Sequence, residues 1–268
     1  MNILEEIADE KRKEIADRKE KFPVKFLETT PYFNTEPVSL RQYLSRPDKT
    51  GLIAEFKRKS PSKGMINPYA KVEQTTIGYM QTAASGLSIL TDEKYFGGKN
   101  ADLTEARRIN YCPILRKDFI LDEYQIVEAK SIGADVVLLI AALISPAETE
   151  TLARFAKSLG LEVLLEVHDS SELKTHLNPF VDVVGVNNRN LKTFEVRIET
   201  SFELAESIPS GILKISESGI SEPQTIVELK SAGFNGFLIG ETFMRSRHPE
   251  KACQQFMKEV QQLISQPV

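Results

Sequence analysis

The sequence predicts a single (β/α)8 TIM barrel preceded by an N-terminal helical extension, and three observations support this prediction. Eight short apolar segments follow one another along the chain, helical stretches separate them, and helix-start and helix-stop residues stand at their borders. This alternation is typical of βα units around a parallel sheet. We assign residues 1–48 to the extension and residues 49–268 to the barrel.

The extension begins with an amphipathic pattern over residues 2–21. Ile3, Leu4, Ile7 and Ile15 form roughly one apolar stripe among acidic and basic residues, which predicts a helix that packs one face on the body. A segment that contains several prolines follows, and a short helix is expected near residues 39–44.

The strands of the barrel are expected where apolar residues cluster. Their ranges are 51–56, 87–90, 113–115, 136–140, 161–165, 181–186, 211–215 and 236–239. Helix starts are expected at 67–68, 145–148, 169–172 and 221–224, and the last three also carry the acid or amide of a capping box. Four glycines are expected to end helices in the left-handed conformation, namely Gly86, Gly133, Gly160 and Gly233.

A doubly wound open sheet is the alternative fold for such an alternation. That fold usually carries a glycine-rich turn after its first strand. Here the first strand is followed by Lys57-Arg58-Lys59-Ser60 without a GxGxxG pattern, so the barrel is favoured.

The composition argues against several classes of protein. The 268 residues are 41% hydrophobic and 27% charged with a net charge of -4, which suggests no nucleic-acid or membrane-surface partner. No apolar run is long enough to span a bilayer. Cys112 and Cys253 belong to no CxxC or Cys/His cluster, so we expect no zinc site, no disulfide framework and a cytoplasmic location. A monomer or weak homodimer is expected.

Ionisable and amide side chains stand at the ends of several predicted strands, where the active site of such a barrel lies. They are Glu55, Lys57, Lys117, Glu166, Asn187 and Glu217. Glu55 and Lys57 are two residues apart on a strand, so they point to the same side. Singly, each group could be a structural ion pair or a cap. Their occurrence together at one end of the barrel favours catalysis.

Lysines among glutamates suit general acid–base chemistry without a metal or a cofactor. Neighbouring carboxylates hold the proton of an ammonium group, whereas burial is expected to lower the pKa of Lys117 or Lys57 towards the working range. A buried glutamate can instead have a raised pKa and alternate between acid and base.

Two loops near the end of the chain are candidates for a phosphate site. Ser218-Gly219 and Gly240-Glu241 follow the last two strands, where barrels often bind phosphate on backbone N–H groups. The loop at Ser60 could add a hydroxyl from the opposite side. The segment 92–98 predicts a lid or substrate loop beside an aromatic wall, with a plain surface turn as the alternative.

The three histidines are not expected to be catalytic. They are His168, His176 and His248. His168 lies just past Glu166 and could contact the mouth of the barrel.

Six motifs in order resemble those of the indole-3-glycerol phosphate synthase family. They are residues 55–64 (EFKRKSPSKG), 91–98 (TDEKYFGG), 115–120 (LRKDFI), 165–168 (LEVH), 185–191 (GVNNRNL) and 216–220 (SESGI). The resemblance covers roughly residues 50–245. It implies a monofunctional enzyme of tryptophan biosynthesis that converts 1-(2-carboxyphenylamino)-1-deoxyribulose 5-phosphate to indole-3-glycerol phosphate, carbon dioxide and water.

The resemblance also implies catalytic roles. Lys117 would be the general acid that protonates the substrate carbonyl oxygen as the ring closes. Glu166 and Lys57 are the candidates for the acid–base exchange of dehydration, and the resemblance does not decide which is the acid. Glu55 and Glu217 would hold the lysines and the substrate hydroxyls in place.

The binding roles follow in the same way. Asn187 would orient the substrate, Arg189 would line its anthranilate end, and Phe119 and Leu138 would form apolar walls for the ring. The phosphate would lie against the loops that carry Ser60, Ser218, Gly219, Gly240 and Glu241.

Glu241 is a departure, because many relatives have Ser at its place. We expect its carboxylate to turn away from the phosphate while its N–H binds. A phosphoribosylanthranilate isomerase, which would need a Cys and an Asp as its acid–base pair, and a non-catalytic phosphate-binding barrel are the rival functions.

Overall fold

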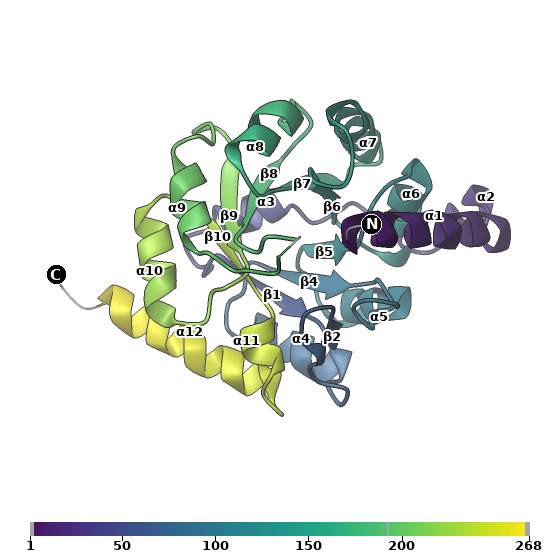
Figure 1. Ribbon diagram of the computed structural model, residues 1–268. Coiled ribbons are helices and arrows are strands. Elements are labelled where there is room, and N and C mark those ends of the chain that lie inside the picture. Colours follow the sequence, from purple (N-terminus) through teal and green to yellow (C-terminus); the bar gives the residue numbers. More distant parts are fainter. Residues whose placement is uncertain (1–2, 192, 266–268) are drawn as a thin grey trace.

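The computed structural model describes residues 3–191 and 193–265, and within them eight parallel strands close into a barrel (Figure 1). The strands lie in the order β1-β10-β9-β8-β7-β6-β5-β4, and β4 pairs with β1 to close the ring. Their bounds are β1 Leu52–Phe56, β4 Gly86–Leu90, β5 Ile114–Lys117, β6 Val136–Ile140, β7 Glu162–Val167, β8 Val183–Asn187, β9 Leu213–Glu217 and β10 Gly236–Ile239. The predicted barrel is confirmed, and the open-sheet alternative is wrong.

Helices surround the ring in Figure 1, and at least one of them follows each strand of the barrel along the chain. They are α4 Val72–Met80, α5 Asn100–Ile109, α6 Glu123–Ile132, α7 Pro146–Ser158, α8 Ser170–His176, α9 Glu199–Ala205, α10 Pro223–Ser231, the short α11 Glu241–Met244 and α12 Pro249–Ser265. None of the helices within the described residues is both long enough and apolar enough to cross a membrane.

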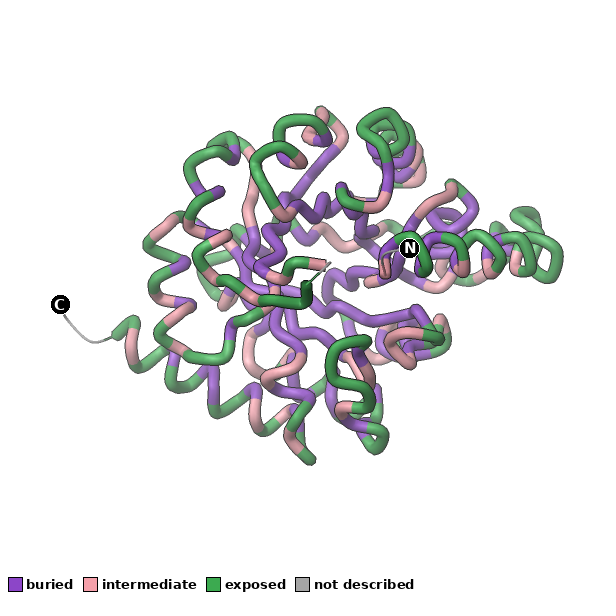
Figure 2. Tube along the Cα trace, in the orientation of Figure 1, coloured by how far each residue is buried: buried purple, intermediate pink, exposed green. Residues whose placement is uncertain are grey.

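The hydrophobic core has two layers, as expected when helices cover the outside of a closed sheet. Outward-facing strand residues such as Leu52, Leu139 and Val184 pack under the helices. Inward-facing residues such as Ile53 and Leu164 fill the barrel. Figure 2 shows buried residues along the strands and exposed residues on the outer faces of the helices. The functional side chains must therefore lie at one end of a filled barrel.

Strand boundaries differ most from the prediction at β9. The apolar run Gly211 to Ile215 predicted a strand there, but β9 is Leu213–Glu217. Pairing with β8 fixes this register, because Leu213 lies opposite Val183 and Glu217 lies opposite Asn187. Glu217 is therefore held within the sheet, next to Asn187, and not in the loop that follows it.

A two-stranded hairpin follows β1 and was not predicted. It pairs β2 Lys59–Ser60 with β3 Gly64–Met65. The two strands are too short to produce a periodic signal in the sequence. The hairpin fixes the place of Ser60, whose hydroxyl accepts a hydrogen bond of 3.3 Å from the backbone N–H of Lys63.

Several predicted helix caps are confirmed. Ser145 and Glu148 form a reciprocal capping box at α7, and Asp169 accepts hydrogen bonds from the first N–H groups of α8. Gly133, Gly160 and Gly233 have positive φ values after their helices.

Three other predictions of helix ends are wrong. Gly86 belongs to β4, and Ala83 takes the left-handed conformation three residues earlier. Helix α4 begins at Val72, while Asn67 donates to the carbonyls of Met244 and Ser246. Helix α10 has Glu222, not Ser221, at its N-cap.

The extension contacts both ends of the barrel. It contains α1 Ile3–Lys21, α2 Val24–Leu27 and α3 Leu40–Leu44. The short helix α3 has the predicted position and is capped by Ser39. Helix α1 lies in front of the barrel in Figure 1, with its N-terminal end near the centre of the ring, whereas α3 lies behind. The apolar stripe predicted for α1 is buried, but so is Lys11, which the amphipathic pattern did not indicate.

Candidate active site

A pocket opens at the carboxyl-terminal end of the barrel, and all but one of the predicted site residues line it. These are Glu55, Lys57, Ser60, Lys117, Phe119, Leu138, Glu166, Asn187, Arg189, Glu217, Ser218, Gly240 and Glu241. Gly219 does not line the pocket and packs against Val196 instead. The strand ends therefore bring together side chains that are up to 186 positions apart in the chain, from Glu55 to Glu241.

Lys117 stands at the centre of the polar part of the pocket. Its Nζ lies 2.5 Å from Glu166 Oε2 and 3.1 Å from Glu217 Oε2. The three side chains come from the ends of β5, β7 and β9, which are alternate strands of the ring. In a barrel, alternate strands contribute side chains to the same layer, which explains why these groups meet.

Glu55 and Lys57 form the ion pair that their spacing predicted. Lys57 Nζ lies 2.5 Å from Glu55 Oε1, and both side chains are largely buried. Space for this pair depends on the neighbouring strand, because a Cβ at position 240 would collide with the Glu55 side chain. Gly240 therefore has a steric role at this end of the barrel.

The pKa of Lys117 is raised overall, so the expectation that burial would bring it down towards the working range is wrong. Burial alone has the largest effect and lowers the pKa, but the charges of Glu166, Glu217 and Glu55 together outweigh it. Lys117 is consequently an ammonium group throughout the neutral range.

The two carboxylates beside Lys117 differ in their proton affinity. Burial, with the charge of Glu166, raises the pKa of Glu217 to about 7 against the effect of Lys117. Burial also acts to raise the pKa of Glu166, but Lys117, His168 and the amide of Asn187 lower it overall. Glu217 thus matches the expectation of a carboxyl group that changes protonation near neutral pH, and Glu166 is a carboxylate there.

Glu217 keeps an oxygen available for another group. Its Oε1 is buried and has no hydrogen-bond partner within residues 3–191 and 193–265. The space beside this oxygen exists because residue 185 on β8 is glycine; a Cβ there would collide with Oε1. A buried polar atom without a partner is costly, and such atoms mark places where function overrides stability.

Asn187 links Glu166 to the loop after β8. Its Nδ2 donates to Glu166 Oε1 at 2.9 Å, and its Oδ1 accepts from the backbone N–H of Arg189 at 3.0 Å. The side chain thereby fixes one oxygen of Glu166 while Lys117 binds the other.

The loops after β9 and β10 form one side of the pocket. Ser218 has a φ of 67° and Gly219 a φ of 80°, both in the left-handed region. For Ser218 this conformation is strained, and such strain often occurs at functional sites. The carboxylate of Glu241 lies 3.8 Å from Nη2 of Arg189, a cation of the neighbouring loop. That it turns away from a bound phosphate stays a prediction.

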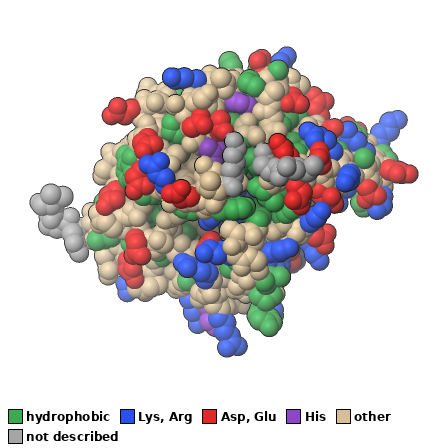
Figure 3. Space-filling model, viewed as in Figure 1, with side chains coloured by type: hydrophobic (Ala, Val, Ile, Leu, Met, Phe, Trp, Pro, Cys, Tyr) green, Lys and Arg blue, Asp and Glu red, His purple; other side chains and the backbone are tan. Residues whose placement is uncertain are grey.

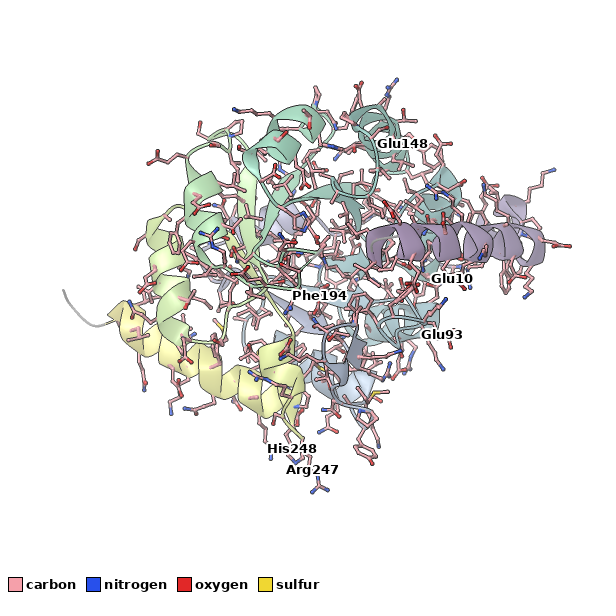
Figure 4. The ribbon with its side chains drawn as sticks, in the orientation of Figure 1. Glu10, Glu93, Glu148, Phe194, Arg247 and His248 are labelled. Atoms are coloured by element: carbon pink, nitrogen blue, oxygen red, sulfur yellow. The ribbon has the colours of Figure 1, made fainter. Side chains whose placement is uncertain are left out.

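The other side of the pocket is apolar. Phe119 and Leu138 were predicted there, and Phe96 contacts Phe119 with ring centroids 5.9 Å apart. Further apolar lining residues come from β4, β6, β10, the loop after β8 and α1. They are Ile3, Leu4, Ile7, Leu90, Ile140, Leu191, Phe194 and Leu238. Phe194 is labelled near the centre of the barrel in Figure 4.

The contribution of α1 to this apolar wall was not predicted from the sequence. Its stripe indicated which face packs on the body, but not which end of the barrel receives it. One signal was available, since Lys11 continues the buried stripe. It forms ion pairs of 2.9 Å with Asp92 and 3.0 Å with Asp118, both at the mouth.

Hydrogen bonds hold the segment 92–98 in place. The carboxylate of Asp92 accepts hydrogen bonds from the N–H groups of Tyr95 and Phe96, and the Tyr95 hydroxyl contacts Glu6 of α1. Phe96 supplies the aromatic wall expected from the sequence. Whether the segment moves as a lid stays a prediction.

Charges of both signs are interspersed on the face shown in Figure 3. No group of three or more His, Cys, Asp or Glu side chains in the described part of the chain is arranged to hold a metal ion. The polar side chains that line the mouth include ammonium, carboxyl and amide groups.

Comparisons with known proteins identify the family of the chain. The family model described as indole-3-glycerol phosphate synthase matches residues 4–256. A protein of that name from Bacteroides thetaiotaomicron is 47% identical over 262 residues, which cover 97% of this chain and 99% of the relative. Another from Magnetococcus marinus is 41% identical, with 96% and 98% covered.

The similarity to solved structures concerns the fold alone. A 3-hexulose-6-phosphate synthase from Salmonella typhimurium superposes with a TM-score of 0.63 at 12% identity, covering 80% of this chain and 99% of that chain. A thiamine phosphate pyrophosphorylase from Pyrococcus furiosus has a TM-score of 0.61 at 17% identity, with 85% and 100% covered.

Proposed function

Because this chain belongs to the indole-3-glycerol phosphate synthase family, we propose that the mouth of its barrel performs the reaction of that family with the residues described above. The chain is a decarboxylating lyase of tryptophan biosynthesis that acts on a small phosphorylated substrate. The isomerase and the non-catalytic barrel considered as alternatives are therefore wrong.

Lys117 is the proposed general acid of ring closure. Its ammonium group is buried and protonated. Lys117 is the last residue of β5 and lines the pocket. It gives a proton to the substrate carbonyl oxygen as the aryl carbon attacks the carbonyl carbon. The ring carboxylate then leaves as carbon dioxide and restores aromaticity. Positioned proton transfer of this kind contributes ~10²–10⁴-fold to rate.

Dehydration requires an acid for the departing hydroxyl and a base for the proton on the adjacent carbon. Glu166 has a lowered pKa, so it is ionised at neutral pH and can accept a proton, which assigns it the role of base. Lys57 is an ammonium group on the opposite wall, paired with Glu55, and is left as the acid. Glu217 is proposed to bind a substrate hydroxyl through its partnerless Oε1.

The phosphate and the ring are proposed to bind on opposite sides of these groups. The loops of Ser218, Gly240 and Glu241, with the Ser60 hydroxyl, form the polar side. Phe119 and Leu138 form part of the apolar side, which suits an anthranilate ring. The place of Arg189 at the anthranilate end stays a prediction. Its contact with Glu241 puts the guanidinium near the polar loops.

The location of Lys117 among three carboxylates at the pocket floor is the observation that carries this proposal. It is tested with the carboxyphenylamino-deoxyribulose phosphate as substrate, by following indole fluorescence. Lys117→Ala should lower kcat by ~10²-fold or more. Glu166→Gln should slow dehydration more than ring closure, so that an intermediate accumulates. Undiminished turnover of Lys117→Ala would remove the assignment of the acid.

Three further expectations rest on the sequence. We propose that residues 1–48 are an extension of the catalytic barrel formed by 49–268, and the contacts of Lys11 support this division. A cytoplasmic location and a monomeric or weakly dimeric state stay predictions.

A further inference from the structure

His168 lies between Glu166 and a second cavity, and the mechanism above gives it no role. Its Nε2 is 3.6 Å from Glu166 Oε1, and this nitrogen is buried without a hydrogen-bond partner in the described part of the chain. On the other side of the ring, Nδ1 is 3.1 Å from Glu172 Oε2. The same carboxylate oxygen accepts a hydrogen bond of 2.7 Å from the backbone N–H of His168. The imidazole therefore bridges carboxylates of β7 and α8.

The second cavity has a volume of about 560 Å³ and adjoins the main pocket. Leu4, Asn187 and Leu191 line both, so these side chains form the partition between them. His168 lines only the second cavity, whereas Glu166 lines only the main pocket. Asn187 also lines the second cavity and donates to Glu166 Oε1, but its amide does not titrate. His168 is therefore the titratable side chain, among the described residues that line the second cavity, placed next to the reactive carboxylate.

The reaction itself requires a supply of protons. Ring closure places one proton on the carbonyl oxygen, and carbon dioxide leaves without taking a proton. Dehydration moves one proton from the adjacent carbon to Glu166 and another from Lys57 to the departing hydroxyl, so it neither consumes nor releases a proton overall. At constant ionisation of the phosphate, each turnover consumes one proton. Lys117 must therefore be reprotonated in every cycle, although its side chain is only 15% exposed and the substrate itself would cover the pocket.

We propose that His168 is the proton inlet of this enzyme, which carries protons from the second cavity to Glu166 and hence to Lys117. The inference rests on the proposed function of Lys117 as the acid. Proton transfer from imidazolium Nε2 to Glu166 Oε1 leaves a neutral imidazole. Rotation of the protonated carboxyl group then brings its O–H to the position of Oε2, which lies 2.5 Å from the Lys117 nitrogen, and the amine takes the proton. The imidazole then takes up a solvent proton. After dehydration the proton that Glu166 took from the carbon leaves through the same imidazole, and Lys57 takes a proton from solvent once the product has left. The cycle thus closes with a net uptake of one proton.

The electrostatic surroundings suit this role. Burial lowers the pKa of His168, but Glu172, Glu166 and Glu217 raise it overall, so the ring can hold a proton near neutral pH. The bond to Glu172 favours the tautomer with a proton on Nδ1, which leaves Nε2 directed at Glu166 as the exchanging atom. The charged residues of the second cavity itself are Asp169, Glu172, Glu195, Arg197 and Glu203.

A matched pair of histidine variants tests the proposal. His168→Ala removes the inlet, and His176→Ala removes another buried histidine, which contacts Thr149 at 2.8 Å and lies at the far end of α8. His168→Ala should lower kcat about tenfold with a KM within about twofold of the wild type, because Glu166 itself remains. Imidazole added to the assay should restore kcat in proportion to its concentration. His176→Ala and the wild type should show no dependence on imidazole.

A second variant tests the direction of the coupling. Glu172→Gln removes a charge that raises the pKa of His168, so the decline of kcat with rising pH should occur at a lower pH than in the wild type. A merely structural role would lower activity equally at all pH values and without rescue. Wild-type kcat in His168→Ala, or a loss that imidazole leaves unchanged, would overturn the inlet. If Lys117→Ala is still inactive in the same assay, only the inlet fails and the proposed function stands.

Discussion

Two buried clusters of charged side chains meet at the mouth of this barrel, and adjacent residues belong to different clusters. Lys117 belongs to a catalytic cluster with Glu166 and Glu217. Asp118 belongs to a cluster that ties α1 and α6 to the mouth, with Lys11 and Arg116 among its members. Because side chains of consecutive strand residues point to opposite sides, one face of β5 builds the site and the other builds its support.

The clusters differ in how completely their groups are paired. Arg116 donates to Thr91, Gln125, Asn100, Asp118 and Glu128. By contrast, the catalytic cluster has two carboxylates around one lysine and leaves Glu217 Oε1 without a partner in the described residues. The charged groups of the supporting cluster pair with one another, whereas one polar atom of the catalytic cluster stays available to the substrate. This difference yields opposite predictions for the two clusters.

The largest expected effect is on stability, in the supporting cluster. Arg116→Met should lower the free energy of unfolding by ~3–5 kcal/mol. It removes one of the two cations paired with each of the buried carboxylates Asp118 and Glu128, together with the other hydrogen bonds that Arg116 donates. Lys117→Met should lower it by less than half as much, since its side chain faces the pocket and Glu217 readily takes a proton. Urea unfolding of both variants measures this. Equal losses of stability in the two variants would contradict the predicted difference between the two clusters.

The pH dependence of stability should differ in sign between the clusters. The pKa of Asp118 is lowered to about 2, because Lys11, Arg116 and hydrogen bonds outweigh the effect of burial. Its contribution is therefore present above the ordinary aspartate pKa and is lost as pH falls towards 2. Asp118→Asn should remove ~2 kcal/mol of stability at pH 6 and much less at pH 2. A constant difference across that range would contradict the assignment.

Glu217 should show the reverse trend. Its pKa is raised to about 7, so the folded protein holds a proton that the unfolded chain releases near pH 4.5. Stability then falls as pH rises from 4.5 to 7. Glu217→Gln, which cannot ionise, should gain on the order of 2 kcal/mol relative to wild type over this interval, while its kcat declines. Thermal unfolding of both proteins between pH 4.5 and 8 measures this trend. If the stability of Glu217→Gln falls with rising pH as steeply as that of the wild type, the prediction is refuted.

The smallest expected effect concerns Glu241, at the edge of the catalytic cluster. Its carboxylate lies on the side proposed for the phosphate and is offset by Arg189 at 3.8 Å. Glu241→Ser should lower KM about twofold, because a partly exposed charge contributes little and salt screens it. The effect should shrink at high ionic strength, which steady-state assays at two salt concentrations can establish. Glu241→Gln is the control of similar size, and it should give the same change.

Sequence by itself determined the barrel and nearly all of its site. Parallel strands with both faces buried form apolar runs, and polar residues that interrupt such runs at their ends, as at Lys117 and Glu166, stand out. The helix caps at Ser145 and Asp169 could also be predicted, because a cap depends on neighbours within four positions along the chain.

Tertiary structure decided what depends on distant partners. The register of β9 against β8 moved Glu217 into the sheet, and the docking of α1 over the mouth buried Lys11 and added Leu4 and Ile7 to the pocket. The rise in the pKa of Lys117 required three carboxylates from other strands. The bridge from Glu172 through His168 to Glu166 likewise exists only because α8 folds back on β7. Coulomb and packing energies depend on distances in space, and a linear pattern of residues does not contain those distances.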